Sequence, residues 1–263
     1  MIIEIITFQL SFLLILTLDS YLLTLTSMLA HYGLLVLILI SGVVYSVSAR
    51  KLTPVAAITG AVVACLVFAG AGYTGVGMMT TFFILGSAAT SWQKHKKQSF
   101  AGPEEHQGGR TTAQVLANAG VGAITGLLVL FFPTYTALWI LMMAASFASA
   151  TADTLSSELG TVYGRRFFNI VTLKPDQRGL DGVISIEGTL IGVAGSCVIV
   201  LVYAIGFGWS SSLIWIVIAG TTGNLTDSVL GALLERRGYM GNNAVNFLNT
   251  LVAVLVMLLI YLI

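Results

Sequence analysis

Apolar stretches long enough to cross a bilayer recur along nearly the whole chain, and they constrain its fold more than any other feature. A stretch of about 20 apolar residues predicts a transmembrane helix, because a helix satisfies its own backbone hydrogen bonds in lipid. Hydrophobic residues make up 57% of the 263 residues and charged residues 9%, with a mean hydropathy of +0.94. We therefore expect an all-α transmembrane bundle that forms a single domain over residues 1–263.

The spacing of these stretches predicts about nine spans. They are expected at residues 2–18, 33–49, 54–72, 76–92, 113–132, 134–152, 183–206, 210–233 and 244–263. The first span is the least regular, because Asp19, Ser20 and several threonines follow it. It is either a short helix or one that continues toward residue 29.

The basic residues predict the orientation. All twelve lie in connectors that these nine spans place on one face, and they are Arg50, Lys51, Lys94, Lys96, Lys97, Arg110, Arg165, Arg166, Lys174, Arg178, Arg236 and Arg237. Basic connectors stay on the cytoplasmic side of a membrane. We therefore expect the N-terminus inside, the C-terminus outside, and cytoplasmic loops at about 93–112 and 160–184.

Acidic residues at membrane depth indicate a functional site, because a carboxylate there is costly unless something compensates it. Asp153 and Glu158 end the sixth span, and Asp227 lies in the eighth, beside Asn224 and Ser228. Oxygen atoms of these kinds suit magnesium, so we predict that Asp153 and Asp227 bind the metal. The alternatives are acids solvated at the interface for the first two, and a hydrogen-bond cluster between helices for Asp227.

Glu158 does not share a helix face with Asp153. A regular helix turns it about 140° away. Both acids can serve one site only if the helix unwinds near Gly160, or if Glu158 pairs with a basic residue elsewhere.

The connector before the seventh span combines cations, glycines and hydroxyls. Backbone N–H groups at a glycine-rich helix N-terminus bind phosphate, and basic side chains add charge. The residues predicted to do so are Lys174, Arg178, Gly182, Ser185, Gly188 and Thr189. The alternative is an ordinary basic loop with a helix cap.

A polar stripe enters the fifth span, where Arg110, Gln114 and Asn118 recur every four residues. In lipid this stripe must face the interior of the bundle. It either contacts phosphate or joins helices by hydrogen bonds.

Together these motifs resemble a known family. They are Arg-x3-Gln-Val-Leu-Ala-Asn at 110–118, Ala-Asp-Thr-x3-Glu-Leu-Gly at 152–160, Gly-x2-Ser-x2-Gly-Thr at 182–189 and Asp-Ser-x2-Gly-Ala at 227–232. The chain resembles the integral-membrane family that includes phytyl-phosphate kinase of the tocopherol pathway. More distantly it is similar to CTP-using lipid kinases and CDP-diacylglycerol synthase. The resemblance implies phosphate transfer to an isoprenoid monophosphate, with CTP or ATP as donor and Mg²⁺.

On this reading the catalytic residues are Asp153, Glu158 and Asp227, with Asn224 and Ser228 helping to hold the metal. Arg110, Lys174 and Arg178 would neutralise phosphates. The partners expected are the bilayer, an isoprenoid phosphate and a nucleoside triphosphate, with no nucleic acid; a homo-oligomer is left open. The alternative functions are a CTP-dependent lipid cytidylyltransferase and, in another class, a lipid-phosphate transporter or flippase.

Overall fold

A computed structural model describes residues 2–98 and 109–263, with side chains from residue 22 onward. The described part is mainly helical, with one pair of two-residue strands in a connector, which confirms the all-α prediction. It divides into two compact units, residues 1–45 and 46–263, and each is described by itself. Seven described helices are long and apolar enough to cross a membrane. The prediction of about nine spans is therefore not confirmed.

The first unit consists of most of one helix, α1 (Ile2–Ser48). The prediction of separate spans at 2–18 and 33–49 is wrong, since α1 is continuous through both. Asp19, Ser20 and the threonines lower helix propensity only slightly. No proline precedes Pro54, so this stretch lacks the strongest helix breaker.

The second unit begins with α2 (Pro54–Ser91), which is two helical arms joined at Gly72. Gly72 has φ 56° and ψ −149°, a conformation that glycine adopts without strain. Lys51 Nζ donates to Ser91 Oγ at 2.7 Å, so the two ends of α2 lie together. The chain must therefore turn back at Gly72, close to the predicted boundary between spans 54–72 and 76–92.

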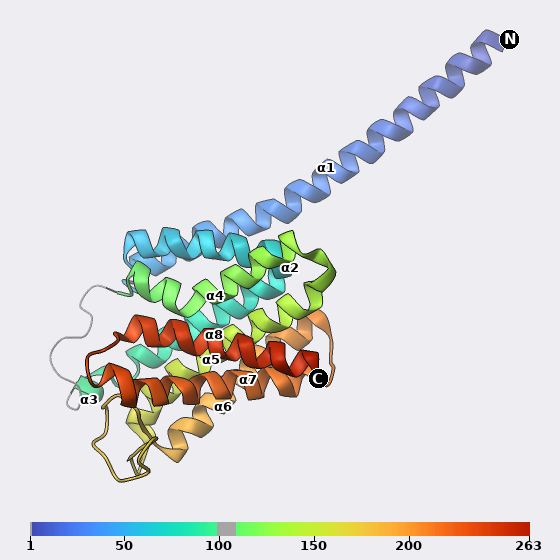
Figure 1. The fold of residues 1–263 in the computed structure, drawn as a ribbon. Coiled ribbons are helices and arrows are strands. Elements are labelled where there is room, and N and C mark those ends of the chain that lie inside the picture. The colour runs from blue at the N-terminus through green and yellow to red at the C-terminus, as the bar shows by residue number, and fades with distance from the viewer. Residues whose placement is uncertain (1, 99–108) are drawn as a thin grey trace. The chain divides into compact units, whose positions relative to one another are not determined.

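The remaining long helices run back and forth between the two ends of this unit (Figure 1). The remaining elements are α3 (Lys94–Gln98), α4 (Thr112–Phe131), η1 (Pro133–Tyr135), α5 (Thr136–Tyr163), β1 (Phe168–Asn169), β2 (Val183–Ile184), α6 (Ile186–Phe207), α7 (Ser212–Leu230), the π-helical η2 (Gly231–Glu235) and α8 (Asn242–Leu262). The two strands pair antiparallel within the connector between α5 and α6.

Helix α5 is the centre of the second unit. It packs against α2, α4, α6, α7 and α8, and it is the most buried of the spanning helices. Small side chains let its neighbours approach closely. Gly220 of α7 lies against Ala148, and Gly122 of α4 against the ring of Phe147. Polar residues of α5 are therefore buried where several helices meet.

The basic connectors gather at one end of the second unit. Arg110 N donates to Lys51 O at 2.9 Å, which places the start of α4 beside the start of α2. Trp92 Nε1 donates to Tyr163 OH at 2.8 Å, which adds the end of α5. The prediction that these connectors share one face holds for this unit, and the side of the membrane that they face stays a prediction.

Candidate functional site

A polar cavity of about 890 Å³ lies at the end that carries the basic connectors. Its walls come from α2, α4, α5, α6, α7, α8 and the connector before α6. Twelve of the fourteen predicted site residues line it. These are Arg110, Gln114, Asn118, Asp153, Glu158, Gly182, Ser185, Gly188, Thr189, Asn224, Asp227 and Ser228.

The structure brings Asp153 of α5 and Asp227 of α7 together. Their carboxyl groups lie within hydrogen-bonding reach of each other, and Asp153 is buried. Asn249 Nδ2 of α8 donates to Asp227 Oδ1 at 2.7 Å. Ser149 Oγ donates to Asn249 Oδ1 at 3.1 Å, which fixes the amide. Two adjacent carboxylates repel each other, so this pair needs a proton or a cation between or beside it.

Further oxygen atoms surround the acid pair. Asn224 Oδ1 accepts from Ser156 Oγ at 2.9 Å, and Ser228 Oγ donates to Asn224 O at 3.5 Å. Among the described residues no group of three or more His, Cys, Asp or Glu could hold a metal. Magnesium commonly binds one or two carboxylates and keeps water or substrate phosphate for the rest. The donor set around Asp153 and Asp227 therefore fits magnesium.

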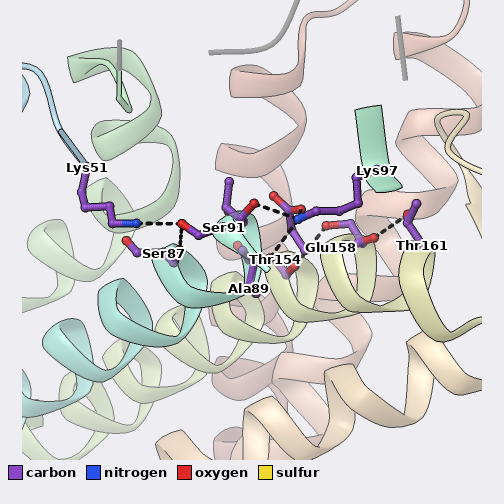
Figure 2. Close-up of polar contacts among 10 residues, drawn as sticks. Lys51, Ser87, Ala89, Ser91, Lys97, Thr154, Glu158 and Thr161 are labelled. Carbon is purple, nitrogen blue, oxygen red and sulfur yellow. Dashed lines mark hydrogen bonds and ion pairs between the residues drawn. The ribbon is translucent and has the colours of Figure 1, made fainter. Parts of the chain in front are cut away.

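Glu158 forms an ion pair with Lys97 (Figure 2). Lys97 Nζ also donates to Ala89 O and Thr90 O, each at 2.9 Å. It thus caps carbonyl groups at the end of α2, where Ala89 O also accepts from Trp92 N at 3.1 Å. Because α5 continues to Tyr163 without unwinding at Gly160, the second alternative holds: Glu158 pairs with a basic residue elsewhere.

Arg110 presents a half-buried guanidinium to the cavity. The guanidinium lies 5.7 Å from the centre of the Phe82 ring and beside Gly86, where an added Cβ would come 2.9 Å from Nη2. Burial lowers the pKa of Arg110, while the charge of Glu158 raises it. Within the described part of the chain, this guanidinium donates no hydrogen bond to another residue. It is therefore available to an anion.

Gln114 and Asn118 lie on α4, one and two turns along the chain from Arg110. Thr111 and Gln114 form a capping box, in which Thr111 N donates to Gln114 Oε1 at 2.8 Å. Asn118 Nδ2 donates to Gln114 O at 2.9 Å. The Asn118 Oδ1 atom is buried and has no hydrogen-bond partner among the described residues. A buried acceptor of this kind calls for a donor from water or ligand.

The glycine-rich segment forms the start of α6. Ser185 Oγ accepts from Gly188 N at 3.1 Å, so the capping alternative is confirmed for this serine. Gly160 and Gly188 bring α5 and α6 close, since a Cβ on Gly160 would come 2.8 Å from Gly188 Cα. Gly182 has φ 74° and lies against Ala232. Whether this segment also binds phosphate stays a prediction.

Lys174 and Arg178 lie outside the cavity, unlike the other predicted residues. Arg178 Nη2 donates to Val162 O at 3.1 Å, and the guanidinium lies 4.8 Å from the centre of the Phe167 ring. Arg178 therefore satisfies the end of α5, where carbonyl groups lack helical partners. Lys174 is exposed in the connector.

Several charged residues that line the cavity were not among the site residues predicted from the sequence. The lining of the cavity includes five basic and five acidic residues, namely Arg50, Lys51, Lys94, Lys97, Arg110, Asp153, Glu158, Asp181, Asp227 and Glu235. Burial raises the pKa of Asp181, whereas the positive charge of Arg236 acts to lower it. The sequence also gave a signal for Asn249, because an asparagine within an apolar span requires a partner. Both signs of charge together suit a cation and a polyanion in one cavity.

The fold and the cavity define a multi-pass helical membrane protein with a polar site at one end of its bundle. The chain belongs to the family described as integral membrane protein DUF92, which it matches over residues 35–254. This match confirms the family that the motifs predicted. No solved structure matches the chain.

Relatives span bacteria, archaea and plants. The chain is 33% identical to an uncharacterized membrane protein of Synechocystis, over 72% of this chain and 74% of the relative. It is 34% identical to an uncharacterized membrane protein of Methanocaldococcus jannaschii, over 70% and 75%. It is 28% identical to the chloroplastic protein VTE6 of Arabidopsis thaliana, over 68% of this chain and 56% of the relative.

Proposed function

We propose that the protein is a membrane-embedded, nucleotide-dependent kinase that converts a phytyl or prenyl monophosphate to the diphosphate. The observation that carries this proposal is the buried pair Asp153 and Asp227 in the same cavity as Arg110 and other cations. Such a cavity suits magnesium and a triphosphate. The family supports the acceptor, since the motifs resemble the family that includes phytyl-phosphate kinase and the chain matches an integral-membrane family whose relatives include VTE6.

The reaction needs positioning and charge neutralisation more than acid–base chemistry. An oxygen of the lipid phosphate attacks the γ-phosphorus of CTP or ATP, the bond to the bridging oxygen breaks, and the nucleoside diphosphate leaves. The acceptor oxygen is already anionic, so no strong general base is required.

The roles proposed for the residues follow their places in the cavity. Asp153, Asp227, Asn224 and Ser228 would hold Mg²⁺, which when bound neutralises phosphate charge. The side chains that would bind phosphate oxygens are Arg50, Lys51, Lys94 and Arg110, in place of Lys174 and Arg178. Glu158 positions Lys97 through their ion pair.

We place the site on the cytoplasmic side, with the C-terminus outside. We no longer place the N-terminus inside, because that prediction required two spans within residues 2–49 and α1 is one continuous helix. The gathering of basic connectors at the end that holds the cavity supports this orientation, because such connectors resist translocation. Nucleoside triphosphates are available on that side.

The test uses purified protein, geranylgeranyl phosphate and nucleotide labelled at either the α- or the γ-phosphate. Transfer of γ-label to the lipid, with release of nucleoside diphosphate, is expected. Transfer of α-label with release of pyrophosphate would instead identify a cytidylyltransferase. Flux of lipid phosphate across liposomes without any transfer would identify a transporter.

A further inference from the structure

A second hollow of about 550 Å³ lies on the outer side of α4, between α2 and α8. Its lining is mainly apolar and includes Val62, Leu66, Leu116, Gly120, Ile124 and Phe247. Leu116 and Ile124 are 45% and 50% exposed, so this groove opens away from the bundle interior. We call it the apolar groove.

The apolar groove and the polar cavity flank the same pair of helices at the same level. On α4, Ala113 and Ala117 line the groove while Gln114 and Asn118 line the cavity. On α8, Asn243 and Phe247 line the groove while Asn242 and Asn246 line the cavity. The α4–α8 contact therefore lies between an apolar hollow and a polar one.

Two side-chain oxygen atoms at this boundary lack hydrogen-bond partners among the described residues. Asn118 Oδ1 and Asn246 Oδ1 are buried, and neither has a hydrogen-bond partner in the described part of the chain. Asn118 is only 8% exposed. Buried acceptors without donors are uncommon in folded proteins. They mark the boundary as a place where water or a polar ligand group is received.

From this arrangement we infer that the apolar groove holds the prenyl chain of the lipid phosphate, and that Gly120 and Ile124 set which chain lengths fit. The inference rests on the proposed function. An amphipathic substrate needs a polar and an apolar hollow side by side, and these two hollows supply them. The phosphate would enter the cavity at the start of α4, between Ala113 on the groove side and Gln114 on the cavity side, while the chain lies along α4 from Ala113 onward.

The length of the groove can be compared with the length of the chain. Gly120 lies seven residues beyond Ala113, or about 10 Å along the helix, and Ile124 about 17 Å. An isoprene unit adds four chain bonds of about 1.5 Å, which is roughly 5 Å when extended. About two units therefore reach Gly120, and about three reach Ile124.

Gly120 is suited to a blocking substitution. A Cβ there would meet only Phe247 Cε2, at 3.8 Å, which is an ordinary contact. A larger side chain would thus extend into the groove without displacing the backbone. Gly60 of α2 is a matched control, because a Cβ there meets nothing within 4 Å and Gly60 is not part of the groove lining.

The experiment measures kcat/KM for geranyl, farnesyl and geranylgeranyl phosphate. In Gly120→Phe we expect values more than tenfold lower for the two longer substrates and little change for geranyl phosphate. Ile124→Trp should lower the value for geranylgeranyl phosphate alone. Gly60→Phe should keep the wild-type profile. If the relative kcat/KM values for the three substrates are the same in Gly120→Phe as in wild type, the inference is overturned.

A binding measurement separates this inference from the proposed function. Geranylgeranyl phosphate with a photoreactive group on its terminal unit should cross-link to α4 and α8 peptides in wild type and in Gly60→Phe, and much less in Gly120→Phe. This result with no phosphate transfer would leave the groove assigned and the kinase proposal wrong. Cross-linking that Gly120→Phe does not alter would reject the groove even if the kinase activity is present.

Discussion

At the scale of single residues, the cavity depends on two acids, one of which is held in place by an amide from another helix. Asp227 receives a hydrogen bond from Asn249, which is itself held by Ser149. Asp153 meets Asp227 from the opposite helix. Since both carboxylates lie inside an apolar bundle, their charge has to be compensated by a ligand or a proton.

The acid pair gives the first prediction. Asp153→Asn and Asp227→Asn keep the shape of the side chain and remove its charge, so each should lower turnover at least a hundredfold while the protein still folds. The measurement is phosphate transfer over a range of magnesium concentrations. Glu187→Gln is the control, because Glu187 lies outside the cavity in an exposed pair with Arg165. Activity near wild type in either aspartate variant would make that aspartate structural.

Asn249 gives the second prediction. Asn249→Ala removes the group that orients Asp227, and we expect kcat to fall about 10- to 100-fold, as for other residues that orient metal ligands. The magnesium concentration for half-maximal activity should rise as well, which a purely structural defect would not cause. Leu255→Ala, on the same helix but outside both the cavity and the apolar groove, should leave both quantities unchanged. An unchanged magnesium requirement in Asn249→Ala would remove Asn249 from the site.

At the scale of elements, the connector between α5 and α6 is anchored at three places. Ser185 begins α6, Arg178 satisfies the end of α5, and Asp176 pairs with Arg236 beyond η2. Gly182 packs against Ala232, which holds the connector at the cavity. These anchors place residues 179–185 in the cavity wall.

The Asp176–Arg236 pair gives the third prediction. The hydrogen bond from Arg236 lowers the pKa of Asp176 from its ordinary 3.8 to about 2. A lowered pKa means that the pair stabilises the connector above about pH 4, and that this stabilisation is lost as the pH falls through about 2. Pepsin should therefore cleave the connector faster as the pH is lowered across this range, and Asp176→Asn should abolish this dependence.

A charge swap checks the same pair independently. Asp176→Arg and Arg236→Asp should each increase cleavage of the connector by a protease that is active at neutral pH. The double variant should restore the protection of the connector. Equal cleavage in the single and double variants would show that other contacts hold the connector.

At the scale of the whole molecule, the second unit is a bundle with two unlike ends. Basic connectors and the cavity occupy one end, whereas the connectors at 132–135 and 208–211 carry no charged residue. This asymmetry is the pattern that orients multi-pass proteins in membranes.

Orientation gives the fourth prediction. In a background with Cys65 and Cys197 replaced by alanine, Trp209→Cys should react with an impermeant maleimide on intact cells, and Thr172→Cys only after the cells are opened. Trp209 and Thr172 are both exposed in connectors, at opposite ends of α6. The reverse labelling pattern would place the cavity outside and contradict the proposed nucleotide chemistry.

Local features of this protein were determined by its sequence alone. Pro54 begins a helix, Gly72 reverses one, and Ser185 caps another, because each depends on groups a few residues away. Long apolar runs likewise determined the helical class, since lipid leaves the backbone no other partners. The continuity of α1 was missed because polar residues resemble a span boundary without breaking a helix.

Only the tertiary structure decided which side chains meet. It paired Asp153 with Asp227, gave Glu158 to Lys97, brought in Asn249, and turned Arg178 toward the end of α5. Each of these contacts joins elements far apart in the sequence, and it depends on which helix faces pack together. Those faces are selected by small residues along α5 and its neighbours, and a sequence pattern does not show which small residue faces which partner.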